Sequence, residues 1–231
     1  MIVPIRLSIS NAFLIKGARP VLIDTGCPGD HATLVQALAK EGVAIRDLAL
    51  ILHTHGHRDH AGGTHQLKQQ TAAPAAIHPA DADMLRKGAH RPLIATNLTG
   101  RLIRPFVDKP FPAMEPDVLL EDGTDLSPYG IVGRIITTPG HTLGSVSVLF
   151  ENGEVVAGDV LVGGYLGGLF AAHVPGYPYF AEDMGMLRAS IAKLLGYSPA
   201  KLYTGHGGPL QAEAIHKRFE CGRGCRRTFR G

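Results

Sequence analysis

The densest group of metal-binding side chains in the sequence lies in the short stretch from Thr54 to Gly63. Its four potential ligands are His55, His57, Asp59 and His60. Imidazoles and carboxylates are buried at a cost unless something pairs with them, and a divalent metal ion suits both. His55 and His57 are two residues apart, so on an extended segment they project to the same side, whereas Asp59 and His60 begin the next turn. The stretch therefore predicts a metal site and can supply ligands to two ions.

Three further potential ligands occupy turns bounded by glycine, each after an apolar run. These are His141 in Pro139-Gly140-His141-Thr142, Asp159 in Gly158-Asp159, and His206 in Gly205-His206-Gly207. Glycine lets the backbone come close to a crowded centre. The seven side chains together are five imidazoles and two carboxylates, a suitable set for two zinc-like ions with one carboxylate shared as a bridge.

The elements before the histidine stretch indicate how it is positioned. Residues 7–16 and 20–24 are expected to form strands joined at Gly17, and a helix is expected between Asp30 as N-cap and Gly42 as its end. An apolar run over 48–53 then ends at the motif. This alternation predicts an α/β fold with the histidines on a loop at the C-terminal end of a strand, where open α/β sheets usually place their chemistry.

The chain after the motif is also mixed. Helices are expected at 64–70, 79–87 and 182–195, and strands at 75–78, 118–120, 131–137, 145–150, 154–157 and 201–204. Residues 88–116 are rich in proline and show no sustained period, which predicts an irregular insertion. It is either a lid whose Arg101 and Arg104 meet an acidic substrate, or a solvated loop or dimer contact.

Composition limits the class of protein. With 231 residues and 45% hydrophobic content, we expect one domain over 1–210 and, over 211–231, the end of a helix and a basic tail carrying Cys221 and Cys225. The net charge of +3 does not favour a nucleic-acid partner. The three cysteines fit a reducing compartment, and no apolar run is long enough for a membrane span. We expect a cytoplasmic monomer or homodimer that acts on a small molecule.

The ligand motifs, in their order and approximate spacing, resemble those of the metallo-β-lactamase-fold hydrolases. The resemblance covers residues from about Asp24 to Gly208 and implies an αββα sandwich, in which helices flank two mixed sheets and the metals lie at one edge. It also implies the role of each ligand. His55, His57 and His141 would hold the first metal, Asp59, His60 and His206 the second, and Asp159 would bridge them, with Asp24 orienting the ligating imidazoles.

The activity that the resemblance implies is hydrolysis of an ester, thioester or lactone by a hydroxide that bridges two divalent ions. Zinc is the expected metal, with iron and manganese as alternatives. Asp59 is the residue expected to steer the hydroxide or to pass on its proton. The alternatives are a persulfide-dioxygenase-like oxidoreductase with one iron and a non-catalytic metal-binding module of the same fold.

Differences from named branches of the family narrow the substrate. Zinc β-lactamases lack a bridging aspartate at the position of Asp159, and acyl-homoserine lactonases carry a tyrosine where this chain has Val162. The chain resembles glyoxalase II at Gly158-Asp159-Val160-Leu161, but the basic residue that contacts glutathione there is replaced around Gly167-Gly168. Because Asp159 is present, the resemblance favours the glyoxalase II and lactonase-like branch and not a true β-lactamase. The differences at Val162 and Gly167-Gly168 leave the substrate within that branch open.

Two further groups of residues complete the candidates. The stretch from Gly163 to Phe180 is rich in glycine and aromatic residues, and it either lines the substrate pocket or packs on the sheet. Its Tyr165 and His173 are candidate proton donors or substrate contacts. The remaining histidines are interpreted as surface or capping residues; they are His31, His53, His65, His78, His90 and His216.

Overall fold

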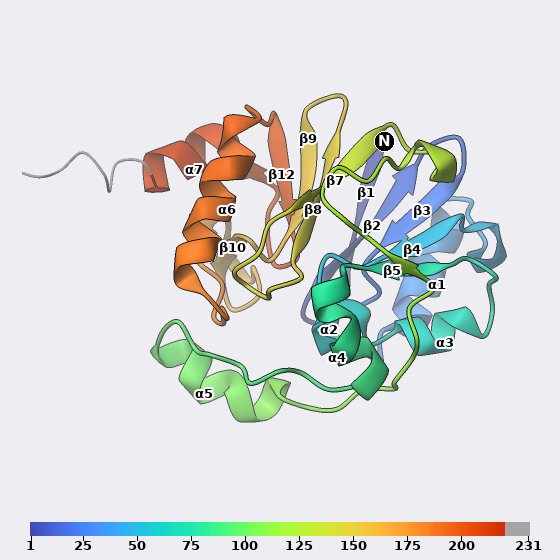
Figure 1. Ribbon diagram of the computed structural model, residues 1–231, viewed down its shortest axis with the longest axis horizontal. Coiled ribbons are helices and arrows are strands. Elements are labelled where there is room, and N and C mark those ends of the chain that lie inside the picture. The colour runs from blue at the N-terminus through green and yellow to red at the C-terminus, as the bar shows by residue number, and fades with distance from the viewer. Residues whose placement is uncertain (220–231) are drawn as a thin grey trace, which may run out of the picture.

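Two mixed β-sheets packed face to face, with helices on their outer sides, form the body of the protein (Figure 1). This architecture comes from a computed structural model that describes residues 1–219, so Cys221 and Cys225 lie outside the described residues. It is the αββα sandwich that the resemblance of the ligand motifs implies. Within the described residues, no helix is both long and apolar enough to cross a membrane.

The first sheet has six strands in sequence order. They are β1 (Ile2–Arg6), β2 (Asn11–Lys16), β3 (Pro20–Ile23), β4 (Leu50–Leu52), β5 (Ala75–Ile77) and β6 (Val118–Leu119). The first three are antiparallel and the rest parallel. The expected strand over 7–16 is wrong at its start, because the Leu7 N–H donates to the Ser10 carbonyl and closes a turn between β1 and β2.

The second sheet has five strands in the order β13-β12-β9-β8-β7. Their bounds are β7 (Gly133–Thr137), β8 (Val146–Phe150), β9 (Glu154–Gly158), β12 (Lys201–Thr204) and β13 (Leu210–Gln211). β9 and β12 are parallel and the other pairs antiparallel. Two more strands, β10 (Val162–Tyr165) and β11 (Phe170–Gly176), form a separate hairpin within the glycine- and aromatic-rich stretch.

Three apolar layers hold the sandwich together, and the alternation of side chains along the strands creates them. Val21 and Ile23 of β3 face the other sheet, whereas Leu22 between them faces the helices outside. Likewise Val156 of β9 lies between the sheets and Val155 lies against the outer helices. The outer helices are α1 (His31–Lys40), α3 (Thr64–Lys68), α6 (Met184–Gly196) and α7 (Ala212–Phe219).

Residues 88–116 contain a helix, α5 (Leu98–Val107), so the prediction of an irregular segment is wrong there. Asn97 caps the helix by accepting a hydrogen bond from the Gly100 N–H. Gly100 and Pro105 are poor helix formers, so the sequence of this segment shows no recognisable helical pattern. The glycine is needed because a side chain at that position would collide with the Tyr179 carbonyl. α5 lies apart from both sheets, at the lower left of Figure 1.

Candidate metal centre

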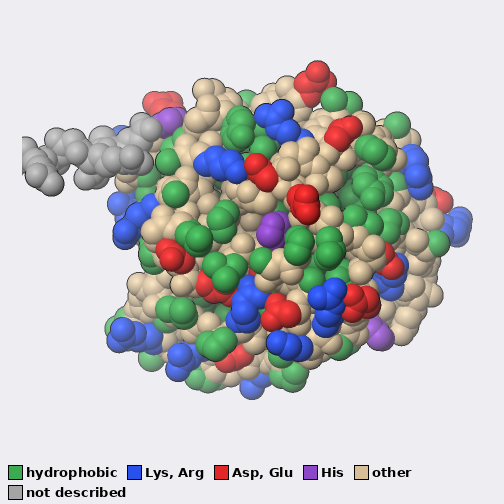
Figure 2. Space-filling view, in the orientation of Figure 1, with side chains coloured by type: hydrophobic (Ala, Val, Ile, Leu, Met, Phe, Trp, Pro, Cys, Tyr) green, Lys and Arg blue, Asp and Glu red, His purple; other side chains and the backbone are tan. Residues whose placement is uncertain are grey.

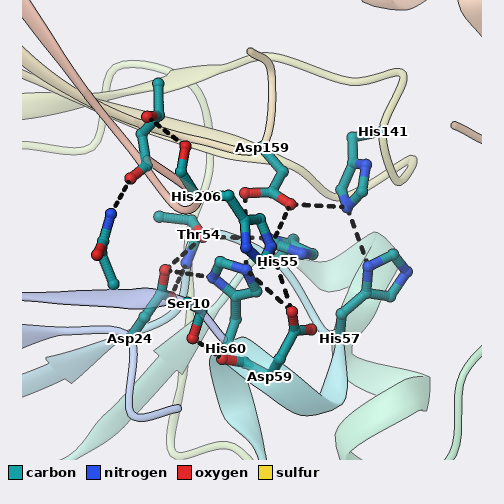
Figure 3. A network of polar contacts seen from close by, with 12 residues as sticks. Ser10, Asp24, Thr54, His55, His57, Asp59, His60, His141, Asp159 and His206 are labelled. Atoms are coloured by element: carbon teal, nitrogen blue, oxygen red, sulfur yellow. Dashed lines mark hydrogen bonds and ion pairs between the residues drawn. The ribbon is translucent and has the colours of Figure 1, made fainter. Parts of the chain in front are cut away.

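The ends of several strands bring the predicted ligands to one edge of the sandwich (Figure 3). β4 leads into the histidine stretch, and the short helix α2 (Arg58–Ala61) begins within it. Asp159 follows β9 directly, and His206 lies just beyond β12. His141 lies in the connection from β7 to β8. All seven predicted ligands therefore meet at one place, although they come from four segments of the chain.

The first group of ligands contains His55, His57 and His141, which are all buried. One ligand atom from each lies within 4.8 Å of the others. His57 Nδ1 is 3.0 Å from His141 Nε2. Three imidazoles that converge in this way match the ligand number of a zinc-type site.

The second group contains Asp59, His60 and His206. His206 Nε2 is 3.3 Å from Asp59 Oδ2, and His60 Nε2 is 3.8 Å from the same oxygen. His60 is fully buried, whereas about a fifth of the Asp59 side chain is exposed. The second group is thus the more open of the two.

Asp159 lies between the two groups. Its Oδ2 is 3.7 Å from His141 Nε2 in the first group and 3.2 Å from His206 Nε2 in the second. Its Oδ1 is 3.6 Å from His60 Nε2. A carboxylate in this position can bind ions on both sides.

Some buried polar atoms have no hydrogen-bond partner in the part of the chain that the structure describes, and they indicate that this centre is built for a metal. Such atoms include His55 Nε2, His60 Nε2 and Asp159 Oδ1, and all three belong to the ligand groups. An unpaired polar atom in a protein interior costs about 1–3 kcal/mol. Nitrogen and oxygen donors in this arrangement fit divalent metal ions, which would satisfy all three atoms.

Hydrogen bonds from outside the centre fix how the imidazoles face it. Asp24 accepts from the Thr54 N–H at 2.8 Å and the Thr54 hydroxyl at 2.7 Å, and its Oδ2 is 2.9 Å from His60 Nδ1. His141 Nδ1 donates to the Phe180 carbonyl at 2.8 Å. Since Nδ1 is occupied in His60 and His141, Nε2 faces the centre in both. Asp24 adopts a left-handed φ of 61°, an uncommon conformation for a residue with a side chain.

A second buried carboxylate, Asp81, connects the two loops of the first group, and sequence reasoning missed it. Asp81 Oδ2 accepts from the Gly56 N–H at 2.9 Å and from the Thr142 hydroxyl at 2.6 Å. Its Oδ1 accepts from the Gly144 N–H at 2.9 Å and from the Arg91 guanidinium at 2.6 Å. Gly56 separates the two histidines of the motif, and Thr142 follows the third. Asp81 therefore holds together the loops that carry all three ligands.

The electrostatics of the two groups differ. Burial and the neighbouring imidazoles of His60 and His141 hold the pKa of His55 well below its usual value. Burial also tends to lower the pKa of His60, but the carboxylates of Asp159, Asp59 and Asp24 outweigh it and raise that pKa to about 9. In the metal-free protein at neutral pH, His55 is therefore ready to bind a metal, whereas His60 must first release a proton.

His53 and His90 are not the surface or capping residues that the sequence suggests. His53 is fully buried and bonded to the Thr64 hydroxyl at 3.0 Å, and burial lowers its pKa to about 4. The ring of His90 is 5.1 Å from that of His57, and its two nitrogens have no hydrogen-bond partner among residues 1–219. Neither residue belongs to a motif, so only the folded chain identifies their surroundings. His78 does cap a helical turn, because it accepts from the Ala80 N–H.

The centre opens into a cavity of about 530 Å³, which His57, Asp59, His141, Asp159 and His206 help to line. Tyr165 and His173, the two candidate substrate contacts, are exposed and do not belong to its lining. In their segment, Leu166, Leu169 and Tyr179 line the cavity instead. The aromatic content pointed to the right segment, but the β10–β11 hairpin turns those two side chains away.

Comparison with known proteins gives consistent matches. The family profile described as the Metallo-beta-lactamase superfamily matches residues 5–206. A probable metallo-hydrolase of Methanocaldococcus jannaschii is 32% identical, and the match covers 86% of this chain and 87% of that protein. A hydroxyacylglutathione hydrolase of Rhodopseudomonas palustris is 30% identical over 77% of this chain, but the match spans only 54% of that enzyme. The crystal structure of TTHA1623 in a di-iron-bound form has a TM-score of 0.68 and 27% identity, covering 94% of this chain and 98% of that one.

Proposed function

Since the chain belongs to the metallo-beta-lactamase superfamily, we propose that it is a metal-dependent hydrolase with two ions that cleaves an ester, thioester or lactone. The observation that carries this proposal is the position of Asp159. Its carboxylate oxygens lie 3.2–3.7 Å from imidazoles of both ligand groups, as a bridge between two ions requires. The Asp59, His60 and His206 group provides a second set of ligands beside the three histidines, which supports a second ion.

The residues divide between the ions as follows. The first ion would be held by His55, His57 and His141, the second by Asp59, His60 and His206, with Asp159 shared. Zinc suits the nitrogen-rich donor set, and iron or manganese would suit the same donors. The di-iron form of TTHA1623 supports two ions in a related fold.

The chemistry needs a water and a carbonyl in the cavity. When bound, two divalent ions would polarise the carbonyl as Lewis acids and lower the pKa of a water molecule towards neutrality. The chain's own contribution is orientation. Asp59 lines the cavity as an ionised carboxylate, because the neighbouring imidazoles of His60 and His206 hold its pKa well below the usual value even though burial raises it. An ionised Asp59 can therefore accept a hydrogen bond from the attacking water and steer it, whereas its low pKa makes this carboxylate a weak proton acceptor.

The test begins with metal analysis. Protein purified without added metal is analysed for metal and assayed on a panel of esters, lactones and glutathione thioesters and, separately, for oxidation of a glutathione persulfide. Two zinc-like ions per chain together with turnover support the proposal. One iron with persulfide oxidation would support the dioxygenase, and bound metal with no turnover would support a binding module.

Paired variants connect turnover to the centre. His57→Ala should lower the metal content and abolish turnover, because it removes a ligand of the first group. The control is His65→Ala, since His65 is exposed and its ring is hydrogen-bonded to the Ala113 carbonyl and belongs to neither ligand group. Equal turnover in the two variants would refute a role for the metal. The cytoplasmic location and the monomeric or dimeric state stay predictions.

A further inference from the structure

The cavity at the metal centre has walls of two kinds. Near the N-terminal strands, Arg6, Ser8, Asn11 and Arg58 provide polar groups. The wall formed by α5 and by the segment from β10 to Phe180 carries no charged side chain. Its main contributors are Ile103, Phe106, Val107, Leu166, Leu169 and Pro178.

The charged residues of α5 lie outside the cavity. Arg101 and Arg104 are exposed and do not contribute to its lining. The idea of a lid whose arginines meet an acidic substrate therefore loses its basis. The same helix turns Ile103 and Val107 towards the cavity, and both are half-buried. The face of the insertion that lines the site is apolar.

Several of these apolar side chains line the cavity and still remain largely exposed. Phe106 is 78% exposed, Leu169 63% and Leu166 55%. Figure 2 shows apolar side chains next to basic ones at the lower left, where α5 lies. Exposed apolar groups that rim a pocket usually mark the place where an apolar ligand binds. The rim leads directly to Asp59 and His141, so its occupant is the molecule that reacts there.

We propose that the substrate carries an apolar acyl chain, on the order of six to ten carbons, that lies between α5 and the β10–β11 hairpin with the scissile carbonyl at the metal centre. This inference rests on the proposed hydrolase function and specifies its substrate. The cavity of about 530 Å³ can hold such a chain.

A glutathione thioester fits this wall less well. Glutathione has two carboxylates and two amide groups, and burying these against uncharged apolar side chains without partners is costly. Methylene groups need no hydrogen-bond partners, and their burial against Leu169 and Phe106 lowers the free energy of binding. The wall therefore selects an alkyl chain over a peptide.

The first experiment measures chain-length dependence with p-nitrophenyl esters from acetate to decanoate on the metal-loaded protein. We expect kcat/KM to rise about two- to fourfold for each added methylene up to about eight carbons, mainly through a lower KM. Calorimetric binding of neutral fatty amides to the metal-free protein gives a readout independent of turnover. Affinity should rise with chain length, and the heat capacity change should be negative.

Two matched variants locate the effect. Leu169→Gln places a polar group in the cavity wall, whereas Leu102→Gln changes a leucine of similar exposure, 66%, that does not line the cavity. Leu169→Gln should flatten the chain-length dependence of kcat/KM and of amide binding. Leu102→Gln should leave the dependence intact.

The outcomes separate the two proposals. Hydrolysis with no chain-length dependence would overturn the apolar-chain inference and leave the hydrolase proposal standing. No hydrolysis of any ester, lactone or thioester would overturn the hydrolase proposal itself. Equal effects of the two variants on the chain-length dependence would overturn the position assigned to the acyl chain. A dimer by sedimentation that Leu169→Gln dissociates, together with a kcat/KM that does not change with chain length, would assign the rim to a second copy of the chain.

Discussion

The substitution Asp81→Asn removes a charge from a fully buried side chain that accepts four hydrogen bonds. Asparagine has almost the same shape but carries one acceptor oxygen and one NH₂ donor. Its oxygen can stay with Gly144 and Arg91. The NH₂ group must then face the Thr142 hydroxyl, which can rotate and accept, and the Gly56 N–H, which cannot.

The magnitude follows from this geometry. One buried N–H left without an acceptor costs about 1–3 kcal/mol. Arg91 loses the charge of one partner but keeps Asp83 and Glu182, so that contribution is about 1 kcal/mol. We expect the free energy of unfolding of the metal-free protein to fall by about 2–4 kcal/mol. Because the lost bond lies between His55 and His57, metal affinity at the first group should fall about 10- to 100-fold.

Urea unfolding and calorimetric metal titration measure the two effects. The control is Asp83→Asn, which removes the charge of another carboxylate that pairs with Arg91. The Asp83 side chain is 40% exposed. This substitution should change the free energy of unfolding by less than about 1 kcal/mol and leave both metal affinities unchanged. The second group, with His60 and His206, should keep its affinity in both variants.

Two results would refute this reasoning. If the free energy of unfolding of Asp81→Asn is within about 1 kcal/mol of that of the unmodified protein, the four hydrogen bonds do not hold the loops together. If both groups lose affinity equally, Asp81 acts on the whole fold and does not position the first group.

Three further predictions concern the same region. Metal binding at pH 7 should release protons, because the pKa of His60 is raised to about 9 in the metal-free protein. The apparent affinity for the metal should therefore increase as pH rises towards 9. Calorimetry in buffers of different ionisation enthalpy measures the proton release, and a release of zero would contradict the prediction. Gly205→Ala should abolish metal binding, since the added methyl group would collide with Asp159 and His60, whereas Gly196→Ala, which meets nothing within 4 Å, should bind metal normally by the same titration. The pKa of His53 is lowered to about 4, so the unfolded chain takes up a proton near pH 6.5 before the folded one does, and His53 should contribute a loss of about 3 kcal/mol of stability to the metal-free protein as pH falls from 6.5 to 4. Urea unfolding of His53→Gln should therefore show a loss smaller by about that amount than the unmodified protein, and an equal loss in both would contradict the prediction.

The order of strands and helices in the sequence predicts a mixed α/β fold, and the resemblance of the ligand motifs to a known family implies the sandwich. Continuous apolar runs such as 20–24 and 154–157 indicate strands that are buried on both faces, and strands of the sandwich occupy Pro20–Ile23 and Glu154–Gly158. The Asn152-Gly153 turn joins two antiparallel neighbours as expected. The helix α5 was missed because Gly100 and Pro105 oppose helix formation locally, and contacts with distant residues compensate for them.

The ligands could be recognised because each has a short motif around it, whereas the residues that support them could not. Asp81 looks like an ordinary residue of a helical turn until the fold brings Gly56 and Thr142 to it. His53 is next to the motif in sequence, but its burial depends on Thr64 and on the packing of the whole sheet. Side-chain direction also decides the pocket, since Tyr165 points outward from the segment that lines it.

The division of the ligands between the two sheets has a consequence for folding. His55, His57, Asp59 and His60 follow a strand of the first sheet, whereas Asp159 and His206 follow strands of the second. An ion held by both sets cross-links the two halves of the chain and opposes their separation, in proportion to its affinity. Metal loading should therefore slow the opening of the sandwich, so that protease resistance of the seam between the sheets reports on the occupancy of the centre.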